Sequence, residues 1–279
     1  MTDTEMALLP DSSKSPRVAL FVDGAGYAQV APHLPADWIC AIVGAAIRPA
    51  YVPELRAAAA YLGVPFLLQP RYDDVGFAEF VENFEHTRPN RILSNSYSMI
   101  LRPEILRIVD YAALNVHAAL LPRHRGPNPM QWALIKDDAL SGVTIHYLND
   151  EMDAGAIVAQ ACVRIVEEDT WISLRDKIMV QTDELFRVGL MNILSEMPAG
   201  VRQENVDSTK NARLSADTPE LIPATMSDRE MFNWIRAQVA PLKGAFVRRG
   251  SRQRHVDRYV AFGDIPALRK ELVEWLEKE

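Results

Sequence analysis

The sequence predicts an α/β fold with a doubly wound, mostly parallel sheet and a small C-terminal domain. Short apolar segments rich in branched residues alternate with segments whose apolar residues have helical spacing. Strands that are joined by helices in this way form parallel sheets. A polar stretch with scattered Gly, Pro, Ser and Asn at 198–220 then precedes a last segment with its own helix signals.

The expected elements follow the chain in order. We expect strands at 17–23, 38–46, 64–68, 91–94, 112–117, 142–148 and 156–166, with the last two paired antiparallel. We expect helices at 53–62, 75–86, 103–110, 130–135, 171–194, 227–237 and 266–279. Gly63 is a typical C-cap, and Ser227 opens an S-x-x-E capping box. The predicted organisation is a disordered tail at 1–16, a main domain at 17–197, a linker at 198–220 and a small domain at 221–279.

Composition excludes several classes of protein. The chain has 279 residues, of which 48% are apolar and 24% charged, as in ordinary soluble globular proteins. No apolar run approaches the roughly 20 residues that span a bilayer, and the N-terminus lacks a signal-peptide layout. We therefore expect a cytoplasmic protein without membrane contact. The net charge of -7 argues against a large nucleic-acid interface.

Two features carry less functional information. Gly24, Ala25 and Gly26 follow the first strand, but Gln29 stands where a dinucleotide fingerprint needs Gly or Ala, so a tight turn is preferred over an NAD site. Cys40 and Cys162 lie in apolar, strand-like segments, where we expect buried thiols. Two cysteines without a nearby pair of His cannot make a four-ligand zinc site, and no other cluster has metal-ligand spacing.

Three polar residues suggest one catalytic site. Asn115 and His117 lie two apart on a predicted strand and therefore share a face, at the carboxyl end where doubly wound sheets bind ligands. Asp153 lies in a Gly-containing loop that can fold back toward them. An amide stabilises a developing oxyanion, a protonated His can do the same, and a carboxylate takes part in proton transfer. No nucleophile turn is present, so the set suits direct acyl transfer.

A longer motif surrounds these residues. NVHAALLPRHRG at 115–126, followed by SGVTIHYLNDEMDAGAIVAQ at 141–160, resembles the 10-formyltetrahydrofolate-dependent formyltransferases, whose pattern is N-x-H-x-S-L-L-P-x-x-R-G, then G-V-T, then a D-x-G loop. Ala119 departs from it, since the family usually has Ser there. The resemblance covers 17 to about 195, and FNWIRAQVAPLKGAF resembles the segment after the family's linker. It implies a Rossmann-like formyltransferase core at 17–197.

The resemblance also implies roles for residues. Asn115 and His117 would stabilise the oxyanion on the formyl oxygen, and Asp153 would assist His117 and relay a proton. The formyl donor would be 10-formyltetrahydrofolate, with its pterin ring against main chain of the two segments that we assign to cofactor binding. These segments are Tyr97, Ser98, Met99, Ile100 and Leu101, and Leu148, Asn149 and Asp150.

The acceptor amine has several candidates. DAGAIVAQ and the short tail resemble nucleotide-sugar N-formyltransferases, so an amino sugar on a nucleotide is preferred, with Arg123, Arg125 and Trp132 as substrate-binding residues. Methionyl-tRNA formyltransferases carry a basic insertion where Arg48 to Leu62 has two arginines and no lysine, so tRNA ranks second. Hydroxyornithine and, last, glycinamide ribonucleotide remain alternatives.

Several further matters stay open at this point. A binding protein for a folate or a nucleotide sugar is the non-enzyme alternative, and a homodimer is one assembly to consider. RRGSRQRH at 248–255 is the one basic cluster, for which a solvated hairpin is preferred over a phosphate contact. Arg123 and Arg125 are about as consistent with solvated loop arginines, and Trp132 with a core position.

Overall fold

The structure, a computed structural model, describes residues 15–204, 206–214 and 219–278. The predicted tail at 1–16 therefore lies outside the described residues, apart from Ser15 and Pro16. Two compact units are built from segments that alternate along the chain. The first comprises Met1–His117, Thr144–Gln160 and Thr182–Glu204, and the second comprises Ala118–Val143, Ala161–Gln181 and Asn205–Glu279. The predicted domain boundaries at 197 and 220 stay a prediction.

The central sheet has seven strands in the order β3-β2-β1-β4-β5-β6-β7. The strands are β1 (Val18–Val22), β2 (Ile39–Ala45), β3 (Phe66–Gln69), β4 (Arg91–Asn95), β5 (Ala113–His117), β6 (Leu140–Tyr147) and β7 (Ile157–Arg164). The first five strands pair in parallel, and β6 runs antiparallel to β5. Tyr147 N donates to Ala156 O and Ile165 N to Ala139 O, so β6 and β7 are antiparallel too. The predicted α/β class and mostly parallel sheet are confirmed.

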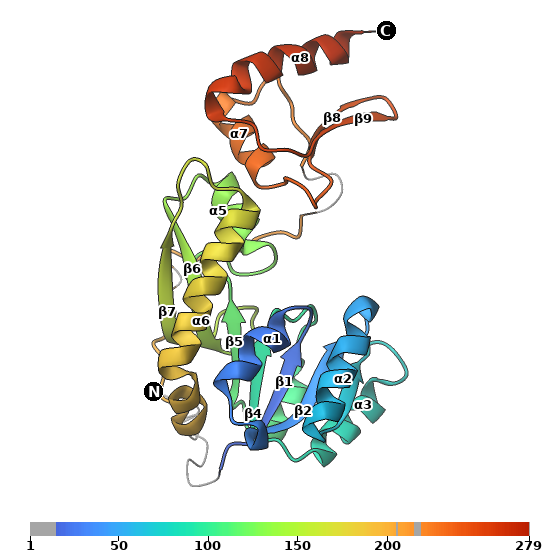
Figure 1. The fold of residues 1–279 in the computed structure, drawn as a ribbon, viewed down its shortest axis with the longest axis vertical. Helices are drawn as coiled ribbons and strands as arrows, with labels where there is room; N and C mark the ends of the chain where they lie inside the picture. The colour runs from blue at the N-terminus through green and yellow to red at the C-terminus, as the bar shows by residue number, and fades with distance from the viewer. Residues whose placement is uncertain (1–14, 205, 215–218, 279) are drawn as a thin grey trace. The chain divides into compact units, whose positions relative to one another are not determined.

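Seven helices of the described residues lie close to the ranges that the sequence predicts. They are α2 (Val52–Leu62), α3 (Phe77–His86), α4 (Pro103–Leu106), α5 (Pro129–Ile135), α6 (Trp171–Glu196), α7 (Asp228–Arg236) and α8 (Ile265–Glu277). A short helix for which no range is predicted, α1 (Gly26–Val30), follows the turn after β1. In Figure 1, α1, α2 and α3 lie around β1 and β2, and α3 also contacts β3. Gly63 ends α2 with a φ of 67°, which is the left-handed cap that the sequence indicates. The predicted helix at 103–110 is α4 followed by a 3₁₀ turn, Arg107–Val109.

The core of the first unit is built on its central strands. Every residue of β1, β2 and β4 is buried, as expected of parallel strands that helices cover on both faces. Phe21 of β1 makes edge contacts with Phe84 of α3 at 5.3 Å and with Tyr97, after β4, at 5.4 Å. Burial raises the pKa of the Cys40 thiol to about 11, against a smaller lowering by Arg17. The prediction for Cys40 is thus confirmed.

The expectation for the second cysteine is wrong. Cys162 is exposed on β7. β7 is the last strand in the sheet order, and one of its faces is largely uncovered. An edge strand can carry apolar residues on both faces without burying both, so its sequence resembles that of an interior strand.

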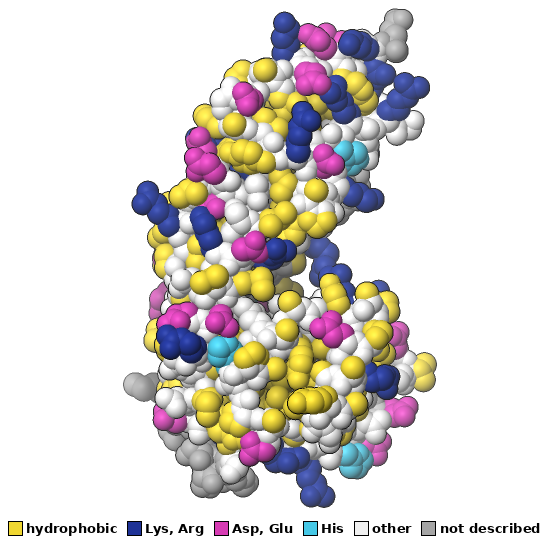
Figure 2. All heavy atoms as spheres, viewed as in Figure 1, with side chains coloured by type: hydrophobic (Ala, Val, Ile, Leu, Met, Phe, Trp, Pro, Cys, Tyr) yellow, Lys and Arg dark blue, Asp and Glu magenta, His cyan; other side chains and the backbone are white. Residues whose placement is uncertain are grey.

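The C-terminal part of the second unit has its own small core. Met231, Phe232 and Ile235 of α7 pack with Ile265 and Leu272 of α8. The predicted capping box is confirmed, because Ser227 Oγ accepts from Glu230 N while the Glu230 carboxylate accepts from Ser227 N. The basic segment after 244 is a hairpin of β8 (Ala245–Arg249) and β9 (Arg252–Val256). Figure 2 shows Lys and Arg side chains gathered over this part of the chain.

No helix of the described ranges has both the length and the apolar character needed to cross a membrane.

Candidate active site

Asn115 and His117 occupy the end of β5, between β4 and β6. The register sets Asn115 beside Ser94 on one side and opposite His146 on the other, and it sets His117 opposite Thr144. Leu114, the residue before Asn115, is fully buried in the core. Alternation along the strand therefore turns the two polar side chains away from Leu114, as the sequence predicts.

His146 is a site residue that the sequence reasoning missed. It is fully buried, and its Nε2 lies 3.2 Å from Asn115 Nδ2. Its Nδ1 lies 2.8 Å from Tyr147 O. A carbonyl oxygen only accepts, so this contact assigns the ring proton to Nδ1 and makes Nε2 an acceptor for the Asn115 amide. His146 thereby fixes which way the Asn115 amide faces. The alternation of GVTIHYL, which puts His146 and Thr144 on one face, is the signal that could have found it.

Asp153 reaches the same place from the loop after β6. Asp153 Oδ2 lies 3.6 Å from His117 Nδ1, and Asp153 Oδ1 lies 3.6 Å from His146 Nε2. The side chains of His117 and Asp153 are only 8% and 13% exposed. The two imidazole rings stand edge to face, with centroids 6.2 Å apart. Both N–O distances exceed hydrogen-bond range, which is common for catalytic groups before a substrate arrives.

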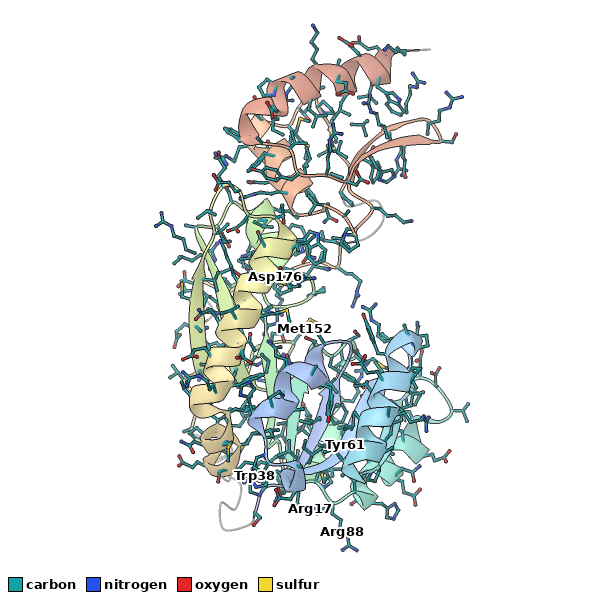
Figure 3. The ribbon with its side chains drawn as sticks, in the orientation of Figure 1. Arg17, Trp38, Tyr61, Arg88, Met152 and Asp176 are labelled. Carbon is teal, nitrogen blue, oxygen red and sulfur yellow. The ribbon has the colours of Figure 1, made fainter. Side chains whose placement is uncertain are left out.

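The loop that carries Asp153 is held tightly. Asp153 has a φ of 51°, a left-handed conformation that Asp tolerates better than most residues. Gln203, itself buried, donates from Nε2 to Asp153 O at 2.9 Å and to Gly155 O at 2.7 Å. A Cβ at Gly155 would lie 1.9 Å from Tyr147 O, so only glycine allows this approach. Met152, which precedes Asp153 in this loop and is labelled in Figure 3, is 51% exposed.

The segments predicted to bind the cofactor start at different points of the sheet. Residues 97–101 follow the carboxyl end of β4, with Leu101 buried and Ile100 exposed. Leu148 N donates to Ala113 O, so Leu148–Asp150 begins beside the amino end of β5, where Tyr111 Oη donates to Asp150 Oδ1. The chain then turns back until Asp153 reaches His117. Asp153 thus joins the second segment to the site, and the cofactor role of both segments stays a prediction.

The residues predicted to bind the substrate lie in the second unit. Arg123 Nη2 donates to Asp138 at 2.6 Å, and the Arg123 side chain is 54% exposed. Arg125 is 3% exposed, and its backbone binds Thr209 O and Asn211 N. Trp132 Nε1 donates to Ala212 O, and its ring packs edge-on against Trp234. Their role toward a substrate stays a prediction.

The turn after β1 packs closely against the end of β4. The strand order reverses between β1 and β4, where doubly wound sheets bind ligands between the strand ends. Here Asn95 Nδ2 donates to Gly26 O at 3.2 Å and to Gln29 Oε1 at 3.1 Å. A Cβ at Gly26 would lie 2.4 Å from Asn95 O. Gly26 therefore serves close packing of α1 on β4, while Gly24 lies in the tight turn that the sequence indicates.

The site combines an oriented amide, two buried imidazoles and a carboxylate between them. Among the residues that the structure describes, no group of three or more His, Cys, Asp or Glu is placed to hold a metal. An amide donor beside an imidazole suits a developing oxyanion, and a carboxylate within reach of that imidazole suits proton transfer. The fold and the site together define an α/β protein equipped for acyl transfer.

Comparison with known proteins names the family. The formyl transferase family model matches residues 50–188. A methionyl-tRNA formyltransferase of Pelotomaculum thermopropionicum is 31% identical over 193 residues, which are 69% of this chain and 60% of that protein. This chain therefore spans about three fifths of that relative's length. The chain belongs to the formyltransferase family, as its motif indicates.

Solved structures confirm the fold. A sugar N-formyltransferase from Shewanella sp. FDAARGOS_354 matches with a TM-score of 0.68 and 18% identity, over 89% of this chain and 98% of that one. A sugar 3N-formyltransferase, WlaRD, crystallised with dTDP and 5-N-formyl-THF, matches with a TM-score of 0.60 and 16% identity, over 80% and 79% of the two chains. At these identities the likeness extends to the fold.

Proposed function

We propose that this protein transfers a formyl group from 10-formyltetrahydrofolate to the primary amine of a nucleotide-linked amino sugar. The observation that carries the proposal is the convergence of Asn115, His117 and Asp153, from β5 and a distant loop, on one buried place. Each residue type has a task in direct acyl transfer. The family's motif lies on these same residues.

The proposed mechanism assigns one role to each side chain. The neutral amine attacks the formyl carbon, and Asn115 Nδ2, oriented by His146, donates to the oxygen on which negative charge develops. His117 in its protonated form donates to the same oxygen, and Asp153 stabilises that cation. Asp153 also relays the proton that the amine loses toward the donor nitrogen, whose bond to the formyl carbon breaks.

The acceptor is proposed from two kinds of support. Two sugar N-formyltransferases share the fold, one of them over 89% of this chain, and WlaRD was crystallised with a nucleotide and a formylated folate. The stretch from Arg48 to Leu62 forms a short 3₁₀ turn and α2, with two arginines and no lysine. It offers little positive charge to a tRNA.

Methionyl-tRNA is the second candidate. A methionyl-tRNA formyltransferase is 31% identical to this chain, and the β8–β9 hairpin exposes Arg248 and Arg252. Two of the hairpin arginines are partly neutralised, because Arg248 pairs with Glu220 at 3.4 Å and Arg254 pairs with Glu271. This pairing favours the small acceptor over a polyanion.

The cytoplasmic location stays a prediction.

The experiment is a panel of acceptors incubated with the enzyme and 10-formyltetrahydrofolate and followed by mass spectrometry. The panel contains nucleotide-linked amino sugars, methionyl-tRNA, hydroxyornithine and glycinamide ribonucleotide. We expect a formylated amino sugar nucleotide. Product only with methionyl-tRNA would replace the proposed acceptor with the second candidate. Binding of folate without any product would favour a binding protein.

A further inference from the structure

A loop beyond β4 is fixed by buried side chains from other strands. We call residues Ser96–Leu101 the 96–101 loop. It begins with Ser96 at a φ of 56°, and it contains the main chain assigned above to the formyl donor. Its shape is not set by regular secondary structure. Hydrogen bonds with side chains outside the loop hold it in place.

Asp23 holds the loop from the end of β1. Its side chain is buried, and the residue is 3% exposed. Asp23 Oδ2 accepts from Ser98 N at 2.8 Å, and Asp23 Oδ1 accepts from Ala45 N, at the end of β2, at 3.2 Å. One carboxylate thus joins β1, β2 and the loop. Hydrogen bonds from backbone amides to an ionised carboxylate are stronger than neutral ones.

Gln69 holds the loop from the end of β3. It is 1% exposed, and its Nε2 donates to Ile100 O at 3.2 Å. Its Oε1 accepts from Tyr97 Oη at 2.9 Å. Burial, and next the negative charge of Asp23, raise the pKa of Tyr97 well above its usual value, so the hydroxyl remains a donor. The two ends of the Gln69 amide therefore bind two points of the same loop.

These contacts lie on the inner side of the loop. Tyr97 packs its ring on Phe21 in the core, while Ile100 is 59% exposed. The backbone of Met99 takes no part in the hydrogen bonds to Asp23 and Gln69. At the outer rim, Arg48 Nε donates to Ser98 Oγ at 2.9 Å. A ligand recognised through backbone groups gains most when those groups are already in place, because less freedom is lost on binding.

We propose that Asp23 and Gln69 are positioning residues for the formyl donor, because they hold the 96–101 loop in the shape that the donor binds. The identity of the ligand rests on the proposed function. The hydrogen bonds that fix the loop are observed in the structure and are independent of that proposal. The two parts can therefore be tested separately.

The test variant is Asp23→Asn, and its control is Asp37→Asn. The first replaces a buried acceptor of two backbone amides by an amide that presents a donor to one of them. The second makes the same change of charge on an exposed residue of the 3₁₀ turn before β2, at the opposite end of that strand. The probe is 5-formyltetrahydrofolate, and its dissociation constant is measured by calorimetry. Hydrogen exchange of the 96–101 loop is measured without any ligand.

For Asp23→Asn we expect faster exchange in the loop and binding weaker by on the order of 10-fold or more, since a hydrogen bond to a charged group contributes at least that factor. With an active acceptor, the donor KM should rise while kcat and the acceptor KM change little. Asp37→Asn should match the wild type in each measurement. If Asp23→Asn does not fold, Gln69→Leu carries the same comparison.

The outcomes separate the two claims. A wild-type protein that does not bind the probe contradicts the proposed donor, while faster loop exchange in the variant still supports the role of Asp23 in holding the loop. Unchanged exchange in Asp23→Asn overturns the positioning role. Wild-type affinity in that variant, with a wild-type protein that does bind the probe, overturns it as well.

Discussion

Two His–Asp pairs lie in the same stretch of sequence and differ sharply in their geometry. His124 Nε2 lies 2.5 Å from Asp138 Oδ2, whereas His117 Nδ1 lies 3.6 Å from Asp153 Oδ2. Both histidines are nearly buried, with side chains 6% and 8% exposed. The residue types and the burial are alike. The partners around each pair are what differ.

The pair in the second unit is fully occupied by structural contacts. Asp138 also accepts from Arg123 at 2.6 Å, His124 Nδ1 contacts Asn211, and His124 N donates to Thr209 Oγ1 at 2.7 Å. In the first unit, Asp153 lies at 3.6 Å from both His117 and His146. A carboxylate between two imidazoles, bound closely to neither, can shift toward one as charge develops. A short, saturated pair stabilises one conformation, and the looser set is suited to proton transfer.

The largest effect is expected at His117 and Asp153, the more widely separated pair. His117→Ala or Asp153→Ala should lower formyl transfer by roughly 10²–10⁴-fold, because oxyanion and acid–base contributions are each of that size. The substitution breaks no hydrogen bond between the two side chains, which lie 3.6 Å apart, so loss of this contact alone should change the melting temperature little. Initial rates and thermal unfolding of each variant check this. Full activity in either variant would remove the assignment of the site.

Substitution in the His124–Asp138 pair should instead lower stability and leave activity nearly unchanged. Asp138→Asn should leave formyl transfer within a few-fold of the wild type, but should lower the free energy of unfolding by about 1–3 kcal/mol, because it removes the carboxylate oxygen that the buried His124 ring contacts at 2.5 Å. Chemical denaturation measures the second quantity. A large loss of activity with unchanged stability would show that the distinction between the pairs is mistaken.

A smaller effect is expected at His146. His146→Leu removes the acceptor that orients the Asn115 amide, so kcat should fall on the order of 10-fold while the KM for the donor stays similar. His146→Gln, whose side-chain oxygen can accept from the same amide, should recover part of the loss. Equal activity of the two variants would mean that His146 contributes packing and not orientation.

The smallest effect concerns the pH dependence of the second unit. Burial raises the pKa of Asp169. Hydrogen bonds from Lys177, Val166 N and Ser173, together with the charge of Lys177, lower that pKa by more than burial raises it. The net pKa therefore lies below its usual value. A carboxyl with a lowered pKa stabilises the folded state fully above its unfolded pKa of about 4, and this contribution disappears as the pH falls through the folded value. The gap in melting temperature between wild type and Asp169→Asn should therefore narrow from about pH 6 to pH 3. A constant gap would contradict the lowered pKa.

The sequence predicts the fold well because its signals are local. Alternation of strands and helices, the Gly63 cap and the Ser227 capping box each depend on a few neighbouring residues, and all three are confirmed. Asn115 and His117 could be paired from their spacing on one strand. Asp153 could be proposed only as a loop residue able to fold back, because a loop residue carries no periodicity that fixes where it lies.

The missed residues share a physical reason. His146 comes opposite Asn115 only through the register of β5 and β6, and Gln203 reaches Asp153 from 50 positions away. Cys162 is exposed because β7 is the last strand in the sheet order. Pairing register, strand order and long-range hydrogen bonds are properties of the assembled sheet. A single sequence does not contain them in any local pattern.

The central claim is that His117 and Asp153 assist the direct transfer of a formyl group from the folate to an amine. The most direct test uses 10-formyltetrahydrofolate with an isotopically labelled formyl carbon, a nucleotide-linked amino sugar, and either wild type or Asp153→Asn. Mass spectrometry should find the labelled carbon on the sugar amine with the wild type, and on the order of 10²-fold less of it with the variant. Equal labelling by both proteins, or none by the wild type with any amine of the acceptor panel, would contradict the claim.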